Sequence, residues 1–243
     1  MKLAILIPVY NEGTTIDRVL RSIVAGGLPS GIEREMVVIN DGSTDRTEAE
    51  LETFRQAHPE LALVYHHEQV NHGKGWCLRR GIALATGDCI VIQDADLEYD
   101  PADHAVMLGP ILEDRADVVY GSRFLNGAPV TTLWHRTVNR GLTALMNRFA
   151  GLRLTDVHTG LKLFRTELLK KVPLVEDRFG FCPEVTARLA KIPGVRWAEV
   201  PVAYHPRNHA QGKKIGFRDG LRALYCIGKY TWPWGRREVS GKR

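Results

Sequence analysis

An acidic stretch at positions 93–100, Gln-Asp-Ala-Asp-Leu-Glu-Tyr-Asp, contains the side chains best suited to chemistry. It follows a short apolar run at 89–92, typical of a buried strand, and precedes an Asp-Pro pair, typical of a helix start. Side chains two apart on an extended chain point the same way, so Asp94 and Asp96 can converge, with Glu98 just beyond. Clustered carboxylates repel one another unless a cation joins them, and Mg²⁺ or Mn²⁺ prefers such ligands. We predict a metal site here; the alternative is a set of solvated turn residues.

The elements that must position this stretch are read from the apolar pattern. In the first half of the chain, short apolar runs alternate with helical patterns, which predicts an α/β fold with a parallel sheet and crossover helices. The expected strands cover residues 3–7, 36–39, 63–65, 89–92 and 118–120. Each ends in a polar or glycine-containing loop, and in an open parallel sheet ligands bind beside the carboxyl ends of the strands. We therefore expect these five loops to form one site.

The second half of the chain has a less regular pattern. Helices are expected at 136–150, from Phe181 onward, and at 217–230, with strands at 161–164 and 195–200. No internal repeat or linker is visible. We predict a single domain over 1–243, with a first half at about 1–125, a second half at about 126–230 and a basic tail at 231–243.

Composition narrows the class of protein. The 243 residues are 44% hydrophobic and 25% charged, as in ordinary soluble domains. No apolar run approaches the ~20 residues needed to cross a bilayer, and the N-terminus has no signal-peptide layout. The four cysteines show no zinc-binding pattern, so we expect reduced thiols in a cytoplasmic protein. Most of the net charge of +5 lies after position 206, which indicates an anionic partner: phosphate, membrane surface or nucleic acid.

Five short motifs occur in a fixed order along the chain. They are Pro8-Val9-Tyr10-Asn11-Glu12, Asn40-Asp41-Gly42-Ser43-Thr44-Asp45, Gly73-Lys74-Gly75, Asp94-Ala95-Asp96-Leu97-Glu98 and Gly121-Ser122-Arg123. In this order they resemble glycosyltransferase family 2. The chain is most similar to the branch of dolichyl-phosphate mannose synthases and bacterial polyprenyl-phosphate glycosyltransferases. One departure is at 135–139, His-Arg-Thr-Val-Asn, where related enzymes carry Arg-Arg-x-x-Ser.

The resemblance implies a GT-A fold, which is a Rossmann-like and mostly parallel sheet flanked by helices. It also implies a nucleotide-sugar donor, either a GDP- or a UDP-sugar, a divalent metal and transfer with inversion at the anomeric carbon. The implied donor-site residues fall into three sets. The nucleoside would be bound by Pro8, Tyr10, Glu12 and Asp41. The metal and diphosphate would be held by Asp94, Asp96 and Glu98, beside Ala95. Phosphates would be bound by Arg123, Arg207 and Lys213.

The residue types agree with this chemistry. Departure of a diphosphate needs fixed positive charge, which Lys74, Arg123 and Arg207 can supply, and a metal acting as a Lewis acid at Asp96. A lipid phosphate acceptor is already ionised at neutral pH and needs no base. A hydroxyl acceptor needs one, and Asp156 is the candidate, although it could instead cap a turn or hold an arginine. Other open alternatives are packing for Tyr10, helix capping for Asp41 and a solvated loop position for Lys74.

The C-terminal helix suggests where the acceptor is found. Leu221, Leu224 and Tyr225 share one side with Phe217 and Cys226, basic residues surround them, and Trp232 follows. Aromatic and basic residues favour the membrane interface, so we predict peripheral contact with the inner face of the cell membrane; the alternative is an ordinary packed helix. The predicted function is sugar transfer to a polyprenyl or dolichyl phosphate, with a hydroxyl acceptor as the alternative. A binding protein for nucleic acid is disfavoured by the acidic stretch.

Overall fold

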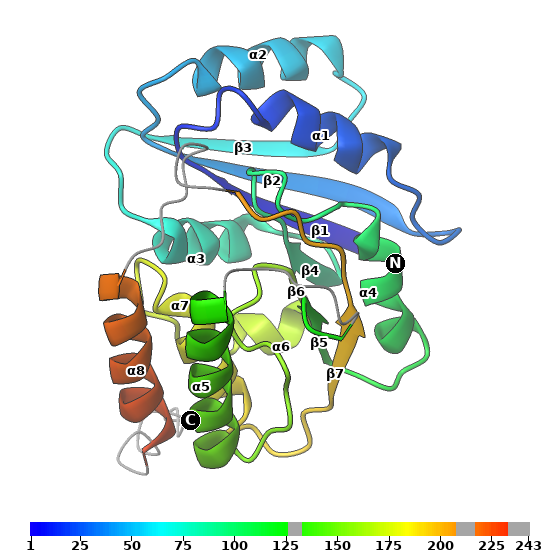
Figure 1. Cartoon of the computed structure of the whole chain (residues 1–243). Coiled ribbons are helices and arrows are strands. Elements are labelled where there is room, and N and C mark those ends of the chain that lie inside the picture. The colour runs from blue at the N-terminus through cyan, green and yellow to red at the C-terminus, as the bar shows by residue number, and fades with distance from the viewer. Residues whose placement is uncertain (126–132, 208–216, 233–243) are drawn as a thin grey trace, which may run out of the picture.

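A computed structural model describes residues 1–125, 133–207 and 217–232, so Lys213 lies outside the described residues. A seven-stranded sheet with the order β3-β2-β1-β4-β6-β5-β7 runs through the molecule (Figure 1). Its strands are β1 (Lys2–Val9), β2 (Glu33–Asp41), β3 (Leu63–Glu68), β4 (Cys89–Ile92), β5 (Val118–Ser122), β6 (Lys162–Arg165) and β7 (Trp197–Pro201). All five strands predicted in the first half are present, which confirms the α/β class.

Strand direction explains which loops reach the site. β1 pairs in parallel with β2 and β4, β2 with β3, and β5 with β7. β6 is antiparallel to both of its neighbours and separates β4 from β5. The sheet is therefore mostly parallel, as predicted. Because β6 runs in the opposite direction, the segment before it, and not the segment after it, lies at the carboxyl edge of the other strands.

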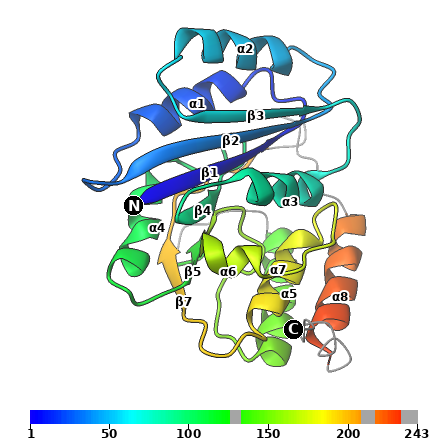
Figure 2. The same cartoon turned by 180° about the vertical axis from the view of Figure 1, so that it is seen from behind.

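Helices cover both faces of the sheet (Figures 1 and 2). One face packs against α1 (Ile16–Ala25), α2 (Thr47–Ala57) and α4 (Asp103–Leu112). The other packs against α3 (Lys74–Leu84), α5 (Leu133–Ala150), α6 (Thr166–Lys170), α7 (Phe181–Leu189) and α8 (Phe217–Thr231). The alternation along β1 shows why: Leu3, Ile5 and Ile7 face the first set, whereas Ala4 and Leu6 face the second. Full burial of each such Leu or Ile contributes about 1.5–3 kcal/mol.

Two local features differ from the sequence expectations. The regular part of α4 begins at Asp103, after a turn in which Asp100 Oδ1 accepts a hydrogen bond from the Ala102 backbone N–H at 2.9 Å. α6 was not predicted, because five residues are too few to show a helical period.

The four cysteines are free, as expected, and three of them are buried. Among the described helices, none combines the length and the apolar character that a membrane span requires.

Candidate active site

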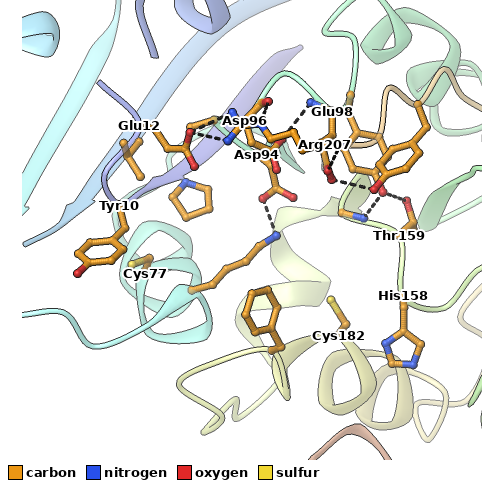
Figure 3. Close-up of a pocket in the computed structure, with 18 of the residues that line it drawn as sticks. Tyr10, Glu12, Cys77, Asp94, Asp96, Glu98, His158, Thr159, Cys182 and Arg207 are labelled. Atoms are coloured by element: carbon orange, nitrogen blue, oxygen red, sulfur yellow. Dashed lines mark hydrogen bonds and ion pairs between the residues drawn. The ribbon is translucent and has the colours of Figure 1, made fainter. Parts of the chain in front are cut away.

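A pocket lies where β1, β2, β4 and β5 end and where the segment before β6 meets them (Figure 3). Most of the residues that the sequence assigned to the donor line it: Pro8, Tyr10, Glu12, Asp41, Lys74, Asp94, Ala95, Asp96, Glu98, Arg123 and Arg207. Asp156 is not part of the lining. The loops thus converge as the parallel-sheet argument predicted, while the role of each residue in binding stays a prediction.

Lys74, the first residue of α3, forms an ion pair with Asp94 across the pocket. Its Nζ lies 2.5 Å from Asp94 Oδ1. Burial acts to lower the pKa of Lys74, but the negative charges around it, with Asp94 foremost, together outweigh burial and raise the net pKa, so the lysine stays charged. Lys74 is therefore not a freely solvated loop residue, and its ammonium group faces the same space as the acidic stretch.

The glycines on either side of Lys74 lie against the backbone of a distant segment. A side chain at Gly75 would collide with the carbonyl oxygen of Glu176, and one at Gly73 would come within 2.7 Å of the carbonyl oxygen of Asp177. Gly73 also has a φ of 102°, which disfavours other residues. The glycines allow close backbone packing between the start of α3 and residues 176–178.

Asp96 lies in an excess of negative charge. Its burial and its proximity to Asp94 and Glu98 raise its pKa to about 7. A carboxyl group in this state favours either a proton or a metal cation. Mg²⁺ and Mn²⁺ sites often use only one or two protein carboxylates and complete the shell with water and phosphate oxygens. Asp94 and Asp96 therefore fit such an ion.

Glu98 does not complete a set of three ligands in this structure. Its Oε2 accepts a hydrogen bond from the Tyr204 hydroxyl at 2.8 Å, and its Oε1 accepts one from the Arg207 backbone N–H at 2.9 Å. Over the described residues, no group of three or more His, Cys, Asp or Glu side chains is arranged to hold a metal ion. The three-carboxylate cluster is thus not assembled here, because β4 ends at Ile92 and the acids lie in a turn in which Leu97 has a φ of 60°.

Arg207 crosses the acidic stretch. Its Nε donates to the Asp96 carbonyl oxygen at 2.6 Å, and both terminal nitrogens lie 3.0 Å from Glu12 Oε2 (Figure 3). This arginine joins the loop after β7 to the ends of β1 and β4. Its predicted contact with a phosphate requires the ligand to compete with these bonds or to use the remaining face of the guanidinium group.

Asp41 organises the loop before α3. Its carboxylate accepts hydrogen bonds from the backbone N–H groups of His72 at 2.8 Å and Gly73 at 2.7 Å, and from the Asn71 side chain at 2.8 Å. It does not cap α2, which was the alternative considered. The loops after β1 and β2 are also bonded together, because the Asn11 backbone N–H donates to Ser43 Oγ at 2.9 Å.

Arg123, which lines the pocket, forms a buried bidentate pair with Asp156, which does not. Arg123 Nε lies 2.6 Å from Asp156 Oδ2, and Arg123 Nη2 lies 2.8 Å from Oδ1. Asp156 is fully buried and Arg123 is 9% exposed. The guanidinium group also lies over the Tyr204 ring, 5.1 Å from its centre. The structure supports the alternative that Asp156 holds an arginine, because a general base must reach a substrate proton.

The sequence assigned no role to several residues that line the pocket. His158, Thr159 and Gly160 come from the segment before β6, and Phe179 and Cys182 come from the region around the start of α7. Burial and the nearby Lys162 ammonium lower the pKa of His158 to about 4, so this imidazole is neutral at physiological pH. The signal that could have identified this segment is its polarity directly before a strand, which points to the site only when that strand is antiparallel.

Comparison with known proteins agrees with this architecture. The sequence model of "Glycosyl transferase family 2" matches residues 4–173. Among solved structures, glucosyl-3-phosphoglycerate synthase from Mycobacterium tuberculosis, in complex with Mn²⁺, uridine diphosphate and phosphoglyceric acid, superposes with a TM-score of 0.69. The two chains are 23% identical, and the match covers 95% of this chain and 78% of that one. This likeness is in the fold, which is the GT-A fold.

Three curated relatives are similar over most of this chain, each at 26% identity. They are a dodecaprenyl-phosphate galacturonate synthase of Rhizobium johnstonii, an undecaprenyl-phosphate 4-deoxy-4-formamido-L-arabinose transferase of Edwardsiella ictaluri and a dolichol-phosphate mannosyltransferase of Pyrococcus furiosus. The matches cover 88%, 92% and 95% of this chain but 62%, 66% and 64% of the relatives. The chain therefore spans less than two thirds of each relative's length. The family model matches most of the chain, and the fold agrees with it: this chain belongs to glycosyltransferase family 2.

Proposed function

We propose that the protein transfers one sugar from a nucleoside-diphosphate sugar to a polyprenyl phosphate, with inversion at the anomeric carbon. The observation that carries the proposal is the pocket itself, in which Asp94 and Asp96 lie with Lys74 and Arg123. Such a mixture of clustered carboxylates and fixed cations suits a metal–diphosphate group, which presents both signs of charge. The names of the three relatives support a polyprenyl phosphate as the acceptor.

Asp94 and Asp96 would hold Mg²⁺ or Mn²⁺. The bound ion would act as a Lewis acid on the diphosphate oxygens. Lys74 is placed to add a fixed positive charge to the same group, once it shares Asp94 with the ion. Because Asp41 fixes residues 71–73, the position of Lys74 is set before the donor binds, so little is lost in ordering the site.

The reaction is a single displacement. An oxygen of the acceptor phosphate forms a bond to the anomeric carbon while the bond from that carbon to the diphosphate oxygen breaks, and the electron pair leaves with the nucleoside diphosphate. The acceptor phosphate is already anionic near neutral pH, so no protein base has to remove a proton. This agrees with Asp156, whose oxygens are bonded to Arg123 and which would keep that arginine oriented.

The N-terminal part of α5 is a candidate site for the acceptor phosphate. Asn139 donates to Asp156 Oδ1 at 3.4 Å, which places this turn of α5 beside the Arg123–Asp156 pair. Arg136 lies one turn earlier on the same face, and within the described parts of the chain its buried Nε has no hydrogen-bond partner. An unsatisfied buried N–H is costly, and a phosphate oxygen would satisfy it.

The outer face of α8 would bring the enzyme to lipid. Leu221, Leu224, Tyr225 and Trp232 are 44–57% exposed and lie on one stripe of the helix, whereas Cys226, expected on the same side, is buried in the core. Arg222 and Lys229 border this stripe. An exposed apolar stripe with a basic border suits the surface of an anionic bilayer. α8 packs against α5 and α7 with its other face (Figure 1).

Activity is tested with the purified protein, a panel of GDP- and UDP-sugars, Mn²⁺ and a short-chain polyprenyl phosphate. A glycolipid product is expected, and Asp96→Asn should lower its rate of formation by about 10²–10³-fold. The matched control is Asp100→Asn, an exposed acid in the same turn, which should retain activity. A product that forms equally well with a chelator present and with Asp96→Asn would contradict the proposal.

Transfer to a hydroxyl group is the second candidate. It is tested by replacing the lipid with small hydroxyl acceptors, including the phosphoglyceric acid found with the Mycobacterium tuberculosis structure. Product from these acceptors and none from lipid phosphate would favour it. Membrane contact is tested separately by sedimentation with anionic vesicles: Leu221→Ser combined with Leu224→Ser should reduce binding, and Val106→Ser, an equally exposed site on α4, should not.

A further inference from the structure

Glu176 is a buried acid outside the pocket that connects two parts of the molecule. Its side chain is 3% exposed and belongs to the segment between α6 and α7. Its Oε2 accepts hydrogen bonds from Arg222 Nε at 2.9 Å and Nη2 at 2.7 Å, and its Oε1 accepts one from the Tyr230 hydroxyl at 2.7 Å. Lys229 Nζ lies 3.6 Å from Oε1. One carboxylate therefore binds three side chains of α8.

The backbone of the same segment packs against the start of α3. The Glu176 carbonyl oxygen accepts a hydrogen bond from Arg79 Nη1 at 2.8 Å, and the Asp177 carbonyl oxygen accepts one from the Trp76 backbone N–H at 3.0 Å. The fit is close enough that only glycine is accommodated at 73 and 75. Lys74 lies between these two glycines. Its backbone position is thus held by contact with residues 176–178 on one side and by the Asp41 hydrogen bonds to His72 and Gly73 on the other.

A second buried acid holds the other side of this segment. Glu184 of α7 accepts hydrogen bonds from the backbone N–H groups of Val175 at 3.0 Å and Glu176 at 2.8 Å, and it is paired with Arg188 at 2.9 Å. The segment is therefore attached to α7 through its backbone and to α8 through the Glu176 side chain. Of these two attachments, only the one through Glu176 reaches the helix with the exposed apolar stripe.

We propose that Glu176 is a positioning residue that ties the 175–180 segment to α8 and so holds Lys74 against Asp94 in the pocket. The effect of this positioning on catalysis rests on the proposed function, in which Lys74 would contact the diphosphate of the donor. It makes α8 part of the frame of the donor site, although α8 supplies no described residue to the pocket lining.

The test measures Lys74 directly, without any ligand. A short pulse of acetic anhydride acetylates lysine side chains, and mass spectrometry of the digest gives the rate at Lys74 relative to the exposed lysines of the same protein. Glu176→Gln keeps the size of the side chain but removes its charge. Lys74 acetylation should become roughly three- to tenfold faster, which corresponds to about 0.7–1.4 kcal/mol.

The control is Asp117→Asn, which removes a comparable arginine-bound acid. Asp117 is bound to Arg165 and Arg196 at the start of β5, far along the sheet from the pocket. The Asp117→Asn variant should be acetylated at Lys74 within about twofold of the wild-type rate, since Asp117 shares no contact with residues 176–178. If Glu176→Gln folds poorly, Arg222→Met removes the same ion pair from the half-exposed side and should change the rate in the same direction.

Two results would overturn the proposal. One is an unchanged Lys74 rate in Glu176→Gln despite a lower unfolding midpoint, which would mean a purely structural role. The other is an equal increase in Asp117→Asn. A second readout is the Kd for UDP and GDP with Mn²⁺, where Glu176→Gln should weaken binding in the wild-type background but not in Lys74→Met. If wild type binds neither nucleotide, the proposed function fails, and the acetylation rates still decide the role of Glu176.

Discussion

Two groups of acids in this family 2 protein differ in the cations that face them: Asp94 and Asp96 after β4, and the buried Asp156, Glu176 and Glu184. In the pocket, Lys74 pairs with Asp94, whereas Arg207 donates to the carbonyl oxygen of Asp96, and the pKa of Asp96 rises to about 7 because of burial and its acidic neighbours. Asp156, Glu176 and Glu184 are each bonded to an arginine. For Glu176, burial acts to raise the pKa, but Tyr230 and Arg222 outweigh it and the net pKa is lowered.

This difference separates scaffold from site. An acid whose charge is matched by an arginine stabilises the protein as it stands, and it gains little from a ligand. Where one lysine pairs with only one of two neighbouring carboxylates, as at Asp94 and Asp96, the excess negative charge lowers the stability of the empty protein. We call these two acids the uncompensated group, and a cation that binds them restores the lost stability. The uncompensated group, Asp94 and Asp96, lies at the end of β4. The arginine-bound acids lie behind the pocket and against α8. The following predictions test this division, from the largest expected effect to the smallest.

The Arg123–Asp156 pair should show the largest loss of stability. Asp156→Asn leaves a buried guanidinium without its countercharge, so the free energy of unfolding should fall by about 3–5 kcal/mol. Urea unfolding at pH 7 measures this loss. The double variant Asp156→Leu with Arg123→Met removes both charges and should recover part of it. An Asp156→Asn protein as stable as wild type would place Asp156 outside the scaffold group.

Asp96 should show the opposite behaviour in metal-free buffer. Its raised pKa means that its contribution to stability is present below its ordinary pKa of 3.8 and is lost as the pH rises through about 7. The free energy of unfolding of wild type, minus that of Asp96→Asn, should therefore decrease by about 1–3 kcal/mol between pH 4 and pH 8. Urea unfolding at several pH values measures it.

Metal addition sharpens the same comparison. Mn²⁺ should raise the unfolding temperature of wild type but not of Asp96→Asn. The ion stabilises the native state only when it binds there, and Asp96→Asn lacks a carboxylate of the proposed binding site. A flat pH profile, together with equal Mn²⁺ responses in both proteins, would remove Asp96 from the uncompensated group.

Asp117 should give the smallest effect, with the reverse dependence on pH. Its hydrogen bond from Arg196 is the main cause that lowers its pKa to about 2. Its contribution is therefore present above pH 3.8 and is lost as the pH falls through 2. Because the pair is partly exposed, Asp117→Asn should cost only about 1 kcal/mol at neutral pH. Thermal unfolding at pH 7 and pH 2 measures it, and a cost that grew toward low pH would contradict the assignment.

The sequence was most informative where residues follow strand ends. The strands at β1, β2 and β4 were each predicted within a few residues, and the polar residues after them do line one pocket. Sequence reasoning was weaker where a residue's partner comes from a distant segment. The partner of Asp156 lies 33 positions away, and the glycines at 73 and 75 pack against residues about 100 positions later. Such pairings depend on how the elements pack, and no local pattern encodes them.

By itself, the sequence determined that apolar strands end in polar loops, and a parallel sheet brings such loops to one edge because its strands share a direction. Only the tertiary structure decided that β6 runs antiparallel between β4 and β5, which brings His158, Thr159 and Gly160 to the pocket from the segment before that strand. It also decided which acids meet arginines and which do not. The physical reason is that charge compensation acts through space over a few ångströms, so it is fixed by packing between segments and not by the order of residues along the chain.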